Sequence, residues 1–344
     1  MGGSKTIEDQ YQKLSNHEHV LKKPTMYIGS IRVEKCPMWI FNTHFADNQA
    51  KIIQKDIEYV PGLYKIYDEI LVNARDHSIR CASCDTIKVS IDKDVGKITV
   101  WNNGKGIDVV EHKVHKTMIP SMIFGELMTS TNFDEKEKRI VGGTNGLGAK
   151  LVNIWSTEFC IETVDSKRKL KFYQKYTNNM YTVDKAKIKS TQEKSFTSIS
   201  FVPDYKRFGM SGMTDDMFAL FKKRVYDIAM NTKCKVYFNN TLISDNTFTK
   251  YIDLYFPEQS EHKKVIDLDD NWKVCVIYDP TDTIEHQNIS FVNGICTYQG
   301  GSHVDYISNQ IVNELKKAIT KKIKDGVVKP AMIKENLIFF VDSI

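Results

Sequence analysis

Apolar residues recur every three or four positions between Pro61 and His77, a spacing that predicts a helix. The apolar positions are Leu63, Ile66, Tyr67, Ile70, Leu71 and Ala74, and they would line one side of that helix. Pro61 fits its first turn. The i, i+4, i+7 spacing of Glu69, Asn73 and Asp76 sets their side chains in a second line. This polar line is either a solvated face or a set of groups that meet one ligand.

Shorter patterns predict the remaining elements. Alternating residues predict strands at 57–60, 86–91, 96–100, 157–163, 169–174, 197–201, 235–238, 242–243, 274–278, 288–293 and 337–341, and three- to four-residue periodicity predicts helices at 118–128, 217–230 and 303–324. Strands 86–91 and 96–100 should pair as a hairpin, as should those flanking Asn239 and Asn240. Residues 203–208 read as a turn. The order predicts an α/β (α+β) sandwich, one mixed sheet with helices on one face.

Three segments lack a clear pattern. Residues 1 to about 30 are polar with little periodicity and should be disordered unless they dock on something. Residues 134–139 are densely charged and suggest a mobile lid. Residues 257–264 read as a charged linker between two domains.

Two glycine-bearing stretches bring candidate chemistry. One is Trp101-Asn-Asn-Gly-Lys-Gly-Ile107; the other is Gly142-Gly-Thr-Asn-Gly-Leu-Gly-Ala-Lys150. Four glycines in seven residues, followed by a helix start, open backbone N–H groups to a phosphate, and Lys150 adds a positive charge. Alone, either stretch could also be a tight turn with a helix-capping glycine. Neither has the P-loop order or the dinucleotide-binding fingerprint.

Together these stretches resemble the ATP-binding signature of the GHKL superfamily, and in particular the ATPase region of eukaryotic-type type IIA DNA topoisomerases. The matching phrases are Val60-Pro-Gly-Leu-Tyr-Lys-Ile66, Asp68-Glu-Ile-Leu-Val-Asn-Ala74, Trp101–Ile107, Val110-Glu-His-Lys113, Gly148-Ala-Lys-Leu-Val-Asn-Ile154, Ser290-Phe-Val-Asn293 and Gly300-Gly-Ser-His-Val-Asp-Tyr306. They run in one order from about residue 11 to 341. The resemblance implies an N-terminal strap (1–30), a GHKL ATPase domain (31–260) and a partial transducer domain of the ribosomal S5 domain 2-like type (261–344).

The resemblance and the residue chemistry together suggest roles for the site residues. Glu69 is the candidate general base that orients the attacking water, and Asn73 offers a neutral oxygen to Mg²⁺. Asp76 would accept a hydrogen bond from the adenine amino group. The other nucleotide-binding residues implied by the resemblance are Tyr11, which would reach the partner protomer's nucleotide, Asn102, Gly104 and Gly106 near the base, Ser130, Thr131 and Asn132 at the ribose and phosphates, and Thr144, Asn145, Gly146, Leu147, Gly148, Ala149 and Lys150 in the phosphate loop.

Three positions depart from the family pattern. The family commonly has Asn at position 77, Arg at 144 and Tyr at 147, where this chain has His77, Thr144 and Leu147. An uncharged Thr144 removes a cation from the phosphate loop, so nucleotide affinity and its salt dependence should differ. The family also places a Gln-Thr-Lys turn beyond a strand matching residues 337–341. The 344 residues contain no such turn, and we expect ATP turnover to be slow without its lysine.

Composition is that of a water-soluble globular protein. The chain has 344 residues, 41% of them hydrophobic and 26% charged, without an apolar stretch long enough to span a membrane. The start Met1-Gly-Gly-Ser-Lys-Thr6 formally fits a myristoylation pattern but equally a flexible leader. Seven scattered cysteines predict reduced thiols in an intracellular compartment. His77, Cys81 and Cys84 have zinc-like spacing but no fourth ligand nearby in sequence.

The predicted partners follow from charge and resemblance. A net charge of +5 is too small to argue for nucleic acid by itself. Lysines are dense near the end of the last long helix, at 316, 317, 321, 322, 324 and 329, and Lys321, Lys322 and Lys324 match the family's DNA-binding loop; a solvated helix face is the alternative. We therefore expect an ATP- and Mg²⁺-dependent homodimeric gate that captures duplex DNA and works with a C-terminal cleavage core. A GHKL clamp or chaperone without strand passage is the alternative, and a sensor kinase fits less well. Location should follow the DNA, in a nucleus or at a viral replication site.

Overall fold

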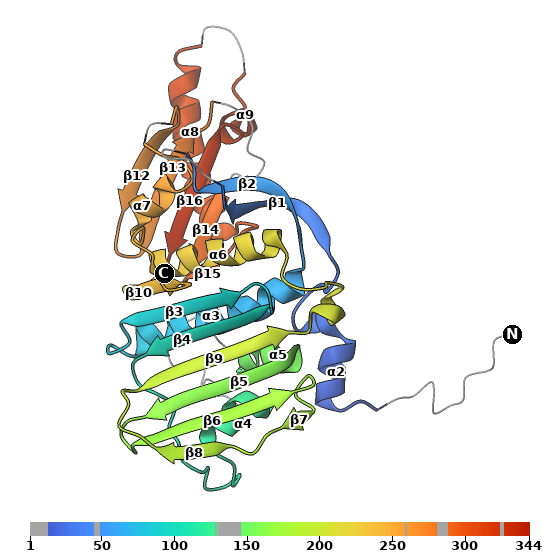
Figure 1. Ribbon diagram of the computed structural model, residues 1–344. Helices are drawn as coiled ribbons and strands as arrows, with labels where there is room; N and C mark the ends of the chain where they lie inside the picture. The colour runs from blue at the N-terminus through green and yellow to red at the C-terminus, as the bar shows by residue number, and fades with distance from the viewer. Residues whose placement is uncertain are drawn as a thin grey trace, which may run out of the picture.

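The computed structural model describes residues 13–44, 49–127, 129, 146–258, 260–280, 288–323 and 327–344. These residues form a two-stranded, a nine-stranded and a five-stranded sheet. In Figure 1 the nine-stranded sheet fills the lower half, the five-stranded sheet stands in the upper half, and the two-stranded sheet lies to the right at the level of the five-stranded sheet.

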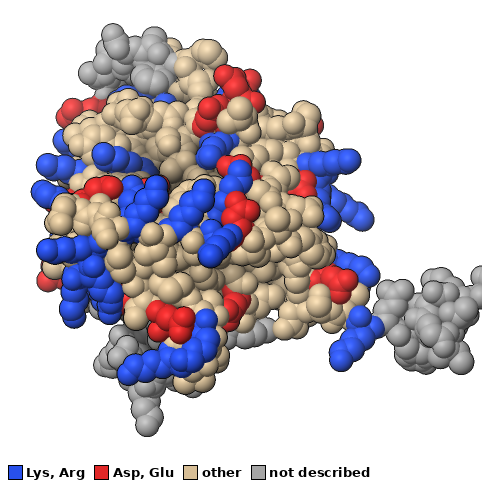
Figure 2. Space-filling view, turned by 60° about the horizontal axis from the view of Figure 1, so that its bottom comes forward, with Lys and Arg blue, Asp and Glu red and all other residues tan. Residues whose placement is uncertain are grey.

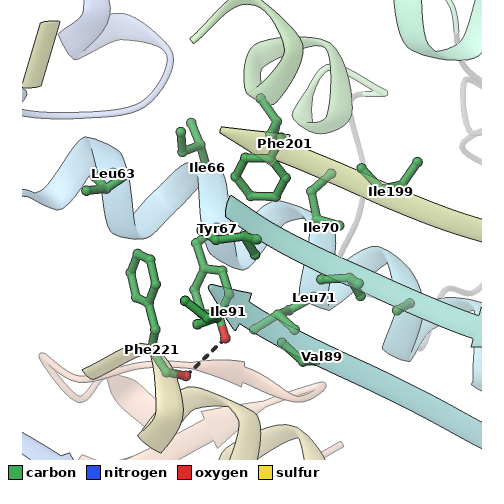
Figure 3. Close-up of a cluster of buried hydrophobic side chains, with 14 of the residues drawn as sticks. Leu63, Ile66, Tyr67, Ile70, Leu71, Val89, Ile91, Ile199, Phe201 and Phe221 are labelled. Carbon is green, nitrogen blue, oxygen red and sulfur yellow. Dashed lines mark hydrogen bonds between the residues drawn. The ribbon is translucent and has the colours of Figure 1, made fainter. Parts of the chain in front are cut away.

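Helix α3 (Pro61–Arg80) is the helix that the apolar spacing predicts. Its apolar side packs on strands β3 (Thr86–Asp92) and β9 (Phe196–Pro203) and on helix α6 (Asp215–Met230), as Figure 3 shows. Tyr67 stacks on Phe221 with ring centroids 4.0 Å apart, and its hydroxyl donates to the Phe221 carbonyl oxygen at 3.0 Å. Burying each large apolar side chain stabilises the fold by about 1.5–3 kcal/mol. This packing fixes the rotation of α3 and so the direction of its polar stripe.

The nine-stranded sheet has the order β11-β10-β3-β4-β9-β5-β6-β7, with β8 also beside β6. The remaining strands are β4 (Lys97–Asn103), β5 (Ser156–Asp165), β6 (Leu170–Thr177), β7 (Thr182–Val183), β8 (Lys187–Ser190), β10 (Lys235–Phe238) and β11 (Thr241–Leu242). Strand β10 is parallel to β3 and the other pairs are antiparallel. Helices α3, α4 (Ile119–Gly125) and α5 (Gly148–Ile154) lie behind the sheet in Figure 1. The predicted mixed sheet with helices on one face is confirmed.

Local signals explain most element boundaries. The predicted hairpin forms, with β3 and β4 joined through residues 93–96. The Thr214 hydroxyl accepts from the Met217 backbone N–H at the start of α6, and two aspartates follow in the first turn. The predicted turn at 203–208 contains a 3₁₀ helix, Tyr205–Phe208. Helix α4 is shorter than the predicted 118–128 because Glu126 is already extended.

The part of the N-terminal segment that the structure describes is ordered and docked, which meets the condition that the sequence set for its order. Helix α2 (Asn16–Lys22) is followed by a 3₁₀ turn, Pro24–Met26. Ser15 and Glu18 form a reciprocal capping box, a signal present in the sequence. Nε2 of His17 lies 2.6 Å from the Asn179 carbonyl oxygen, so the segment docks on the chain itself. The next residues form the antiparallel pair β1 (Glu34–Phe41) and β2 (Ile52–Tyr59), which packs near α6.

The second unit is the sheet β12-β13-β16-β14-β15 with helices α8 and α9. Its elements, with the preceding helix α7, are α7 (Phe248–Asp253), β12 (Lys263–Leu268), β13 (Trp272–Tyr278), β14 (Asn288–Val292), β15 (Ile295–Cys296), α8 (Ser302–Thr320), α9 (Pro330–Lys334) and β16 (Leu337–Ser343). The predicted linker overlaps β12, a charged edge strand, and charged edges are common because they discourage further pairing. Helix α8 ends four residues earlier than predicted, since Ile319 is its last apolar contact.

Among the described helices, none combines the length and the apolar character that crossing a membrane requires.

Candidate functional site

The polar stripe of α3 runs from a half-buried carboxylate to a fully buried one. Glu69 forms an ion pair with Lys65 one turn earlier, Nζ to Oε1 2.5 Å. Asn73 is exposed one turn further on, and Asp76 is only 1% exposed. The three groups predicted to share a ligand thus lie on one helix face, with two oxygen-bearing groups near the surface and a third in the interior.

Glu69 is in direct contact with the start of helix α5. A Cβ atom built on Gly148 would lie 1.9 Å from Oε2 of Glu69, far closer than two such atoms can approach. A larger residue at position 148 would have to push the Glu69 carboxylate aside. The candidate base on α3 and the predicted phosphate loop, 79 residues later, are therefore neighbours in space.

Lys150 is a buried cation without a carboxylate partner among the described residues. Its side chain is nearly inaccessible, and Nζ donates to the Thr129 carbonyl oxygen at 2.5 Å and to that of Gly146. Burial lowers the pKa of Lys150 from 10.5 to about 8. Carbonyl dipoles only partly replace the lost hydration, so an anion arriving here would gain a strong partner. Gly146, Leu147 and Ala149 are partly buried beside it.

At the other end of the stripe, the first glycine stretch packs tightly on the core. Asn102 is 7% exposed and donates from Nδ2 to the Asn103 carbonyl oxygen at 2.9 Å. A Cβ on Gly104 would lie 2.7 Å from Cβ of Cys84, and one on Gly106 would lie 1.9 Å from the backbone oxygen of Val164. Gly104 also has φ +96°. Packing alone requires both glycines, whatever ligand they meet.

Cysteine side chains contact this loop. The Cys81 sulfur accepts from the Lys105 backbone N–H at 3.3 Å. Burial, with Arg80 and Lys105 nearby, lowers the pKa of His77, the residue that departs from the family pattern. All seven cysteines are free, and the described residues contain no cluster of three or more His, Cys, Asp or Glu able to hold a metal ion. The alternative of a zinc site finds no ligand set in this part of the chain.

Several predicted site residues lie outside the described residues. These are Tyr11, Ser130, Thr131, Asn132, Thr144, Asn145 and Lys324, together with the charged stretch 134–139. Sequence reasoning missed Lys65 and Arg75. The i, i+4 spacing of Lys65 and Glu69 is a readable ion-pair signal. No local pattern distinguishes Arg75, because its closest partner, the Asn293 carbonyl oxygen, lies far away in the sequence.

Positive charge is distributed unevenly over the described surface. Figure 2 shows lysine and arginine side chains spread over one face with acidic residues among them. On the nine-stranded sheet, Lys97 and Lys175 both pair with Glu158, at 3.1 and 2.7 Å, and Lys171 pairs with Glu162 at 2.6 Å. By contrast, Lys321 and Lys322, just after α8, are exposed and form no ion pair with a described residue. The charge on the sheet is partly compensated, whereas that after α8 is available to phosphates.

Comparisons with known proteins match both units. The family model described as "Histidine kinase-, DNA gyrase B-, and HSP90-like ATPase" matches residues 59–203, and the model described as "DNA gyrase B" matches residues 236–344.

The chain is 60% identical over 341 residues to DNA topoisomerase 2 of Acanthamoeba polyphaga mimivirus and 42% identical over 347 residues to DNA topoisomerase 2-alpha of Gallus gallus. Both matches cover 98% of this chain, but only 27% and 22% of those proteins. The chain thus spans about a quarter of these curated relatives. The crystal structure of the ATPase region of Saccharomyces cerevisiae topoisomerase II matches with a TM-score of 0.89 and 39% identity, over 98% of this chain and 87% of that one.

Proposed function

The chain belongs to the DNA topoisomerase II family, in which it corresponds to the ATPase region, and we propose that it binds and hydrolyses Mg²⁺-ATP to operate a gate for duplex DNA. The contact between Glu69 and Gly148 carries this proposal. It sets a carboxylate against the loop whose backbone N–H groups and Lys150 would hold the phosphates.

Groups suited to phosphoryl transfer to water lie among the described residues. Glu69 would orient a water molecule and accept its proton, while Lys150 would balance the charge on the phosphates. Lys65 forms an ion pair with the Glu69 carboxylate and would have to share it with the attacking water. Asp76, deep in the same stripe, would accept from the adenine amino group beside Asn102.

A magnesium ion fits the residues present. Asn73 is exposed, carries a neutral oxygen and lies one turn from Glu69. Mg²⁺ commonly takes one or two protein ligands and fills its shell with phosphate oxygens and water, so no acidic cluster is needed. Asn73 would hold the ion, which when bound would neutralise phosphate charge. Glu69 would still orient the attacking water, and Lys150 and the backbone N–H groups of the loop would still hold the phosphates.

The wider role is also part of this proposal. We propose that ATP binding joins two copies of the chain, with Tyr11 reaching the partner's nucleotide, and that Lys321, Lys322 and Lys324 contact the DNA backbone. DNA cleavage would then belong to a C-terminal core, and location would follow the DNA. The family match over both units supports this gate over a clamp or chaperone without strand passage.

Replacing Glu69 tests the chemistry. Glu69→Ala should keep nucleotide affinity and slow hydrolysis at least about a hundredfold, because it removes the base but leaves the phosphate loop intact. Glu58→Ala, an exposed carboxylate on β2, is the matched control. Binding of a non-hydrolysable ATP analogue and steady-state phosphate release give the two readouts. Turnover within about tenfold of the unaltered chain would assign the base to another residue.

A further inference from the structure

The turn between β14 and β15 is held by two arginines from the ATPase unit. Asn293 and Gly294 form it, with φ +49° and +70°. Nη1 of Arg75 donates to the Asn293 carbonyl oxygen at 2.6 Å, and Nη2 of Arg224 donates to the Gly294 carbonyl oxygen at 3.1 Å. Arg75 belongs to α3 and Arg224 to α6, so one turn of the second unit receives a charged hydrogen bond from each helix.

The contact between the two arginines and the Asn293–Gly294 turn is close-packed as well as hydrogen-bonded. A Cβ on Gly294 would lie 2.6 Å from both Cζ and Nε of Arg75. Arg75 is 4% exposed and Arg224 is fully buried. A buried guanidinium group needs partners in fixed positions, because displacing a partner leaves a buried charge unpaired. The turn and the arginines therefore have little freedom to move independently.

The same two arginines also hold the functional helix. Nη1 of Arg75 lies 3.3 Å from Oδ1 of Asp76, the candidate adenine acceptor. Nε of Arg224 donates to Asp68 at 2.7 Å, and Asp68 immediately precedes Glu69, the candidate base. Arg75 thus joins Asp76, at the inner end of the polar stripe, to the Asn293–Gly294 turn, and Arg224 joins Asp68, the neighbour of Glu69 at the other end, to the same turn.

We propose that Arg75 is a positioning residue that couples the adenine end of the site to the Asn293–Gly294 turn of the second unit. Nucleotide that binds Asp76 alters the environment of the charge partner of Arg75. Because the Arg75 guanidinium is tightly packed, a shift of this group also shifts the turn that it contacts. Arg224 binds the Gly294 carbonyl oxygen on the other side of the turn and holds the turn in place. This inference rests on the proposed nucleotide site.

Hydrogen exchange in the full 344-residue chain tests the coupling. The probe is Mg²⁺ with a non-hydrolysable ATP analogue, and the readout is exchange at the β14–β15 hairpin with and without it. In the unaltered chain, we expect the analogue to change hairpin exchange at least threefold. Arg75→Met should reduce that change to less than half while analogue affinity stays within about tenfold, and Arg75→Lys should restore part of it. Arg80→Met, an exposed arginine of the same helix, should leave it intact.

A second variant approaches the contact from the other side. Gly294→Ala places a methyl group on the Arg75 guanidinium without altering α3, and it should reduce the hairpin response as Arg75→Met does. Gly294→Ala also tests the coupling if Arg75→Met does not fold. A merely structural Arg75 would change hairpin exchange equally with and without the analogue. That result, or a full response in either variant, overturns the coupling. An unaltered chain that binds the analogue without a hairpin response also overturns it, while a chain that binds no analogue refutes the proposed function too.

Discussion

Lys150 should make the stability and the nucleotide affinity of this protein respond to pH in opposite directions. Its pKa falls from 10.5 to about 8 in the folded chain because it is buried without a carboxylate among the described residues. A depressed lysine pKa means that the unfolded chain binds the proton more tightly. The resulting destabilisation is fully present below the folded pKa of about 8 and disappears as pH rises toward 10.5.

The size of the effect follows from this shift. At pH 7 the protonated Lys150 should cost about 3 kcal/mol of unfolding free energy, and about 1.3 kcal/mol of that should return between pH 7 and pH 9. Over the same interval the share of protonated Lys150 in the free protein should fall about tenfold. If bound phosphate keeps the lysine charged, nucleotide affinity should fall about tenfold as well.

Two titrations against one variant measure both effects. Urea unfolding and binding of a non-hydrolysable ATP analogue would be followed from pH 7 to 9 for the unaltered chain and for Lys150→Met, which keeps the length but not the charge. Subtracting the pH dependence of Lys150→Met from that of the unaltered chain removes the contributions of the nucleotide and of other titrating groups. Lys113→Met, an exposed lysine, controls for loss of one charge. If the unaltered chain and Lys150→Met show the same pH dependence of stability, Lys150 does not have a lowered pKa, and the predicted pH dependence of nucleotide affinity fails with it.

Two further predictions concern the metal and DNA. Asn73→Ala should abolish the Mg²⁺ dependence of analogue binding, measured by titration with and without the ion, because it removes the protein ligand proposed for the metal; tight binding that still needs Mg²⁺ would exclude Asn73 from that site. Changing Lys321, Lys322 and Lys324 to Glu should weaken duplex binding and flatten the dependence of log affinity on log salt by roughly 2–3, about 0.9 for each lost phosphate contact. The same charge change at the exposed Lys185, Lys189 and Lys194 is the control, and equal slopes in both triple variants would mark the cluster as a solvated surface.

Local patterns in the sequence were sufficient for the elements that a few neighbouring residues determine. Helix α3, the β3–β4 hairpin and helix α6 form where periodicity, turn residues and caps predict them, since each depends on interactions within about four positions or across a short turn. The polar stripe on α3 follows from the same spacing. The capping box of α2 was equally readable, although the polar character of the segment concealed it.

Tertiary structure decided what those elements meet. Strand β10 lies parallel to β3 about 150 residues away, Glu69 touches Gly148, Lys150 is buried beneath two carbonyl oxygens, and Arg75 reaches Asn293 across 218 positions. No local pattern encodes these contacts, because they depend on how whole faces pack and on which charges are left without water. The sequence by itself therefore determined which groups could act on a nucleotide. Only packing decided which of them lie together, how their pKa values shift and how the site is joined to the second unit.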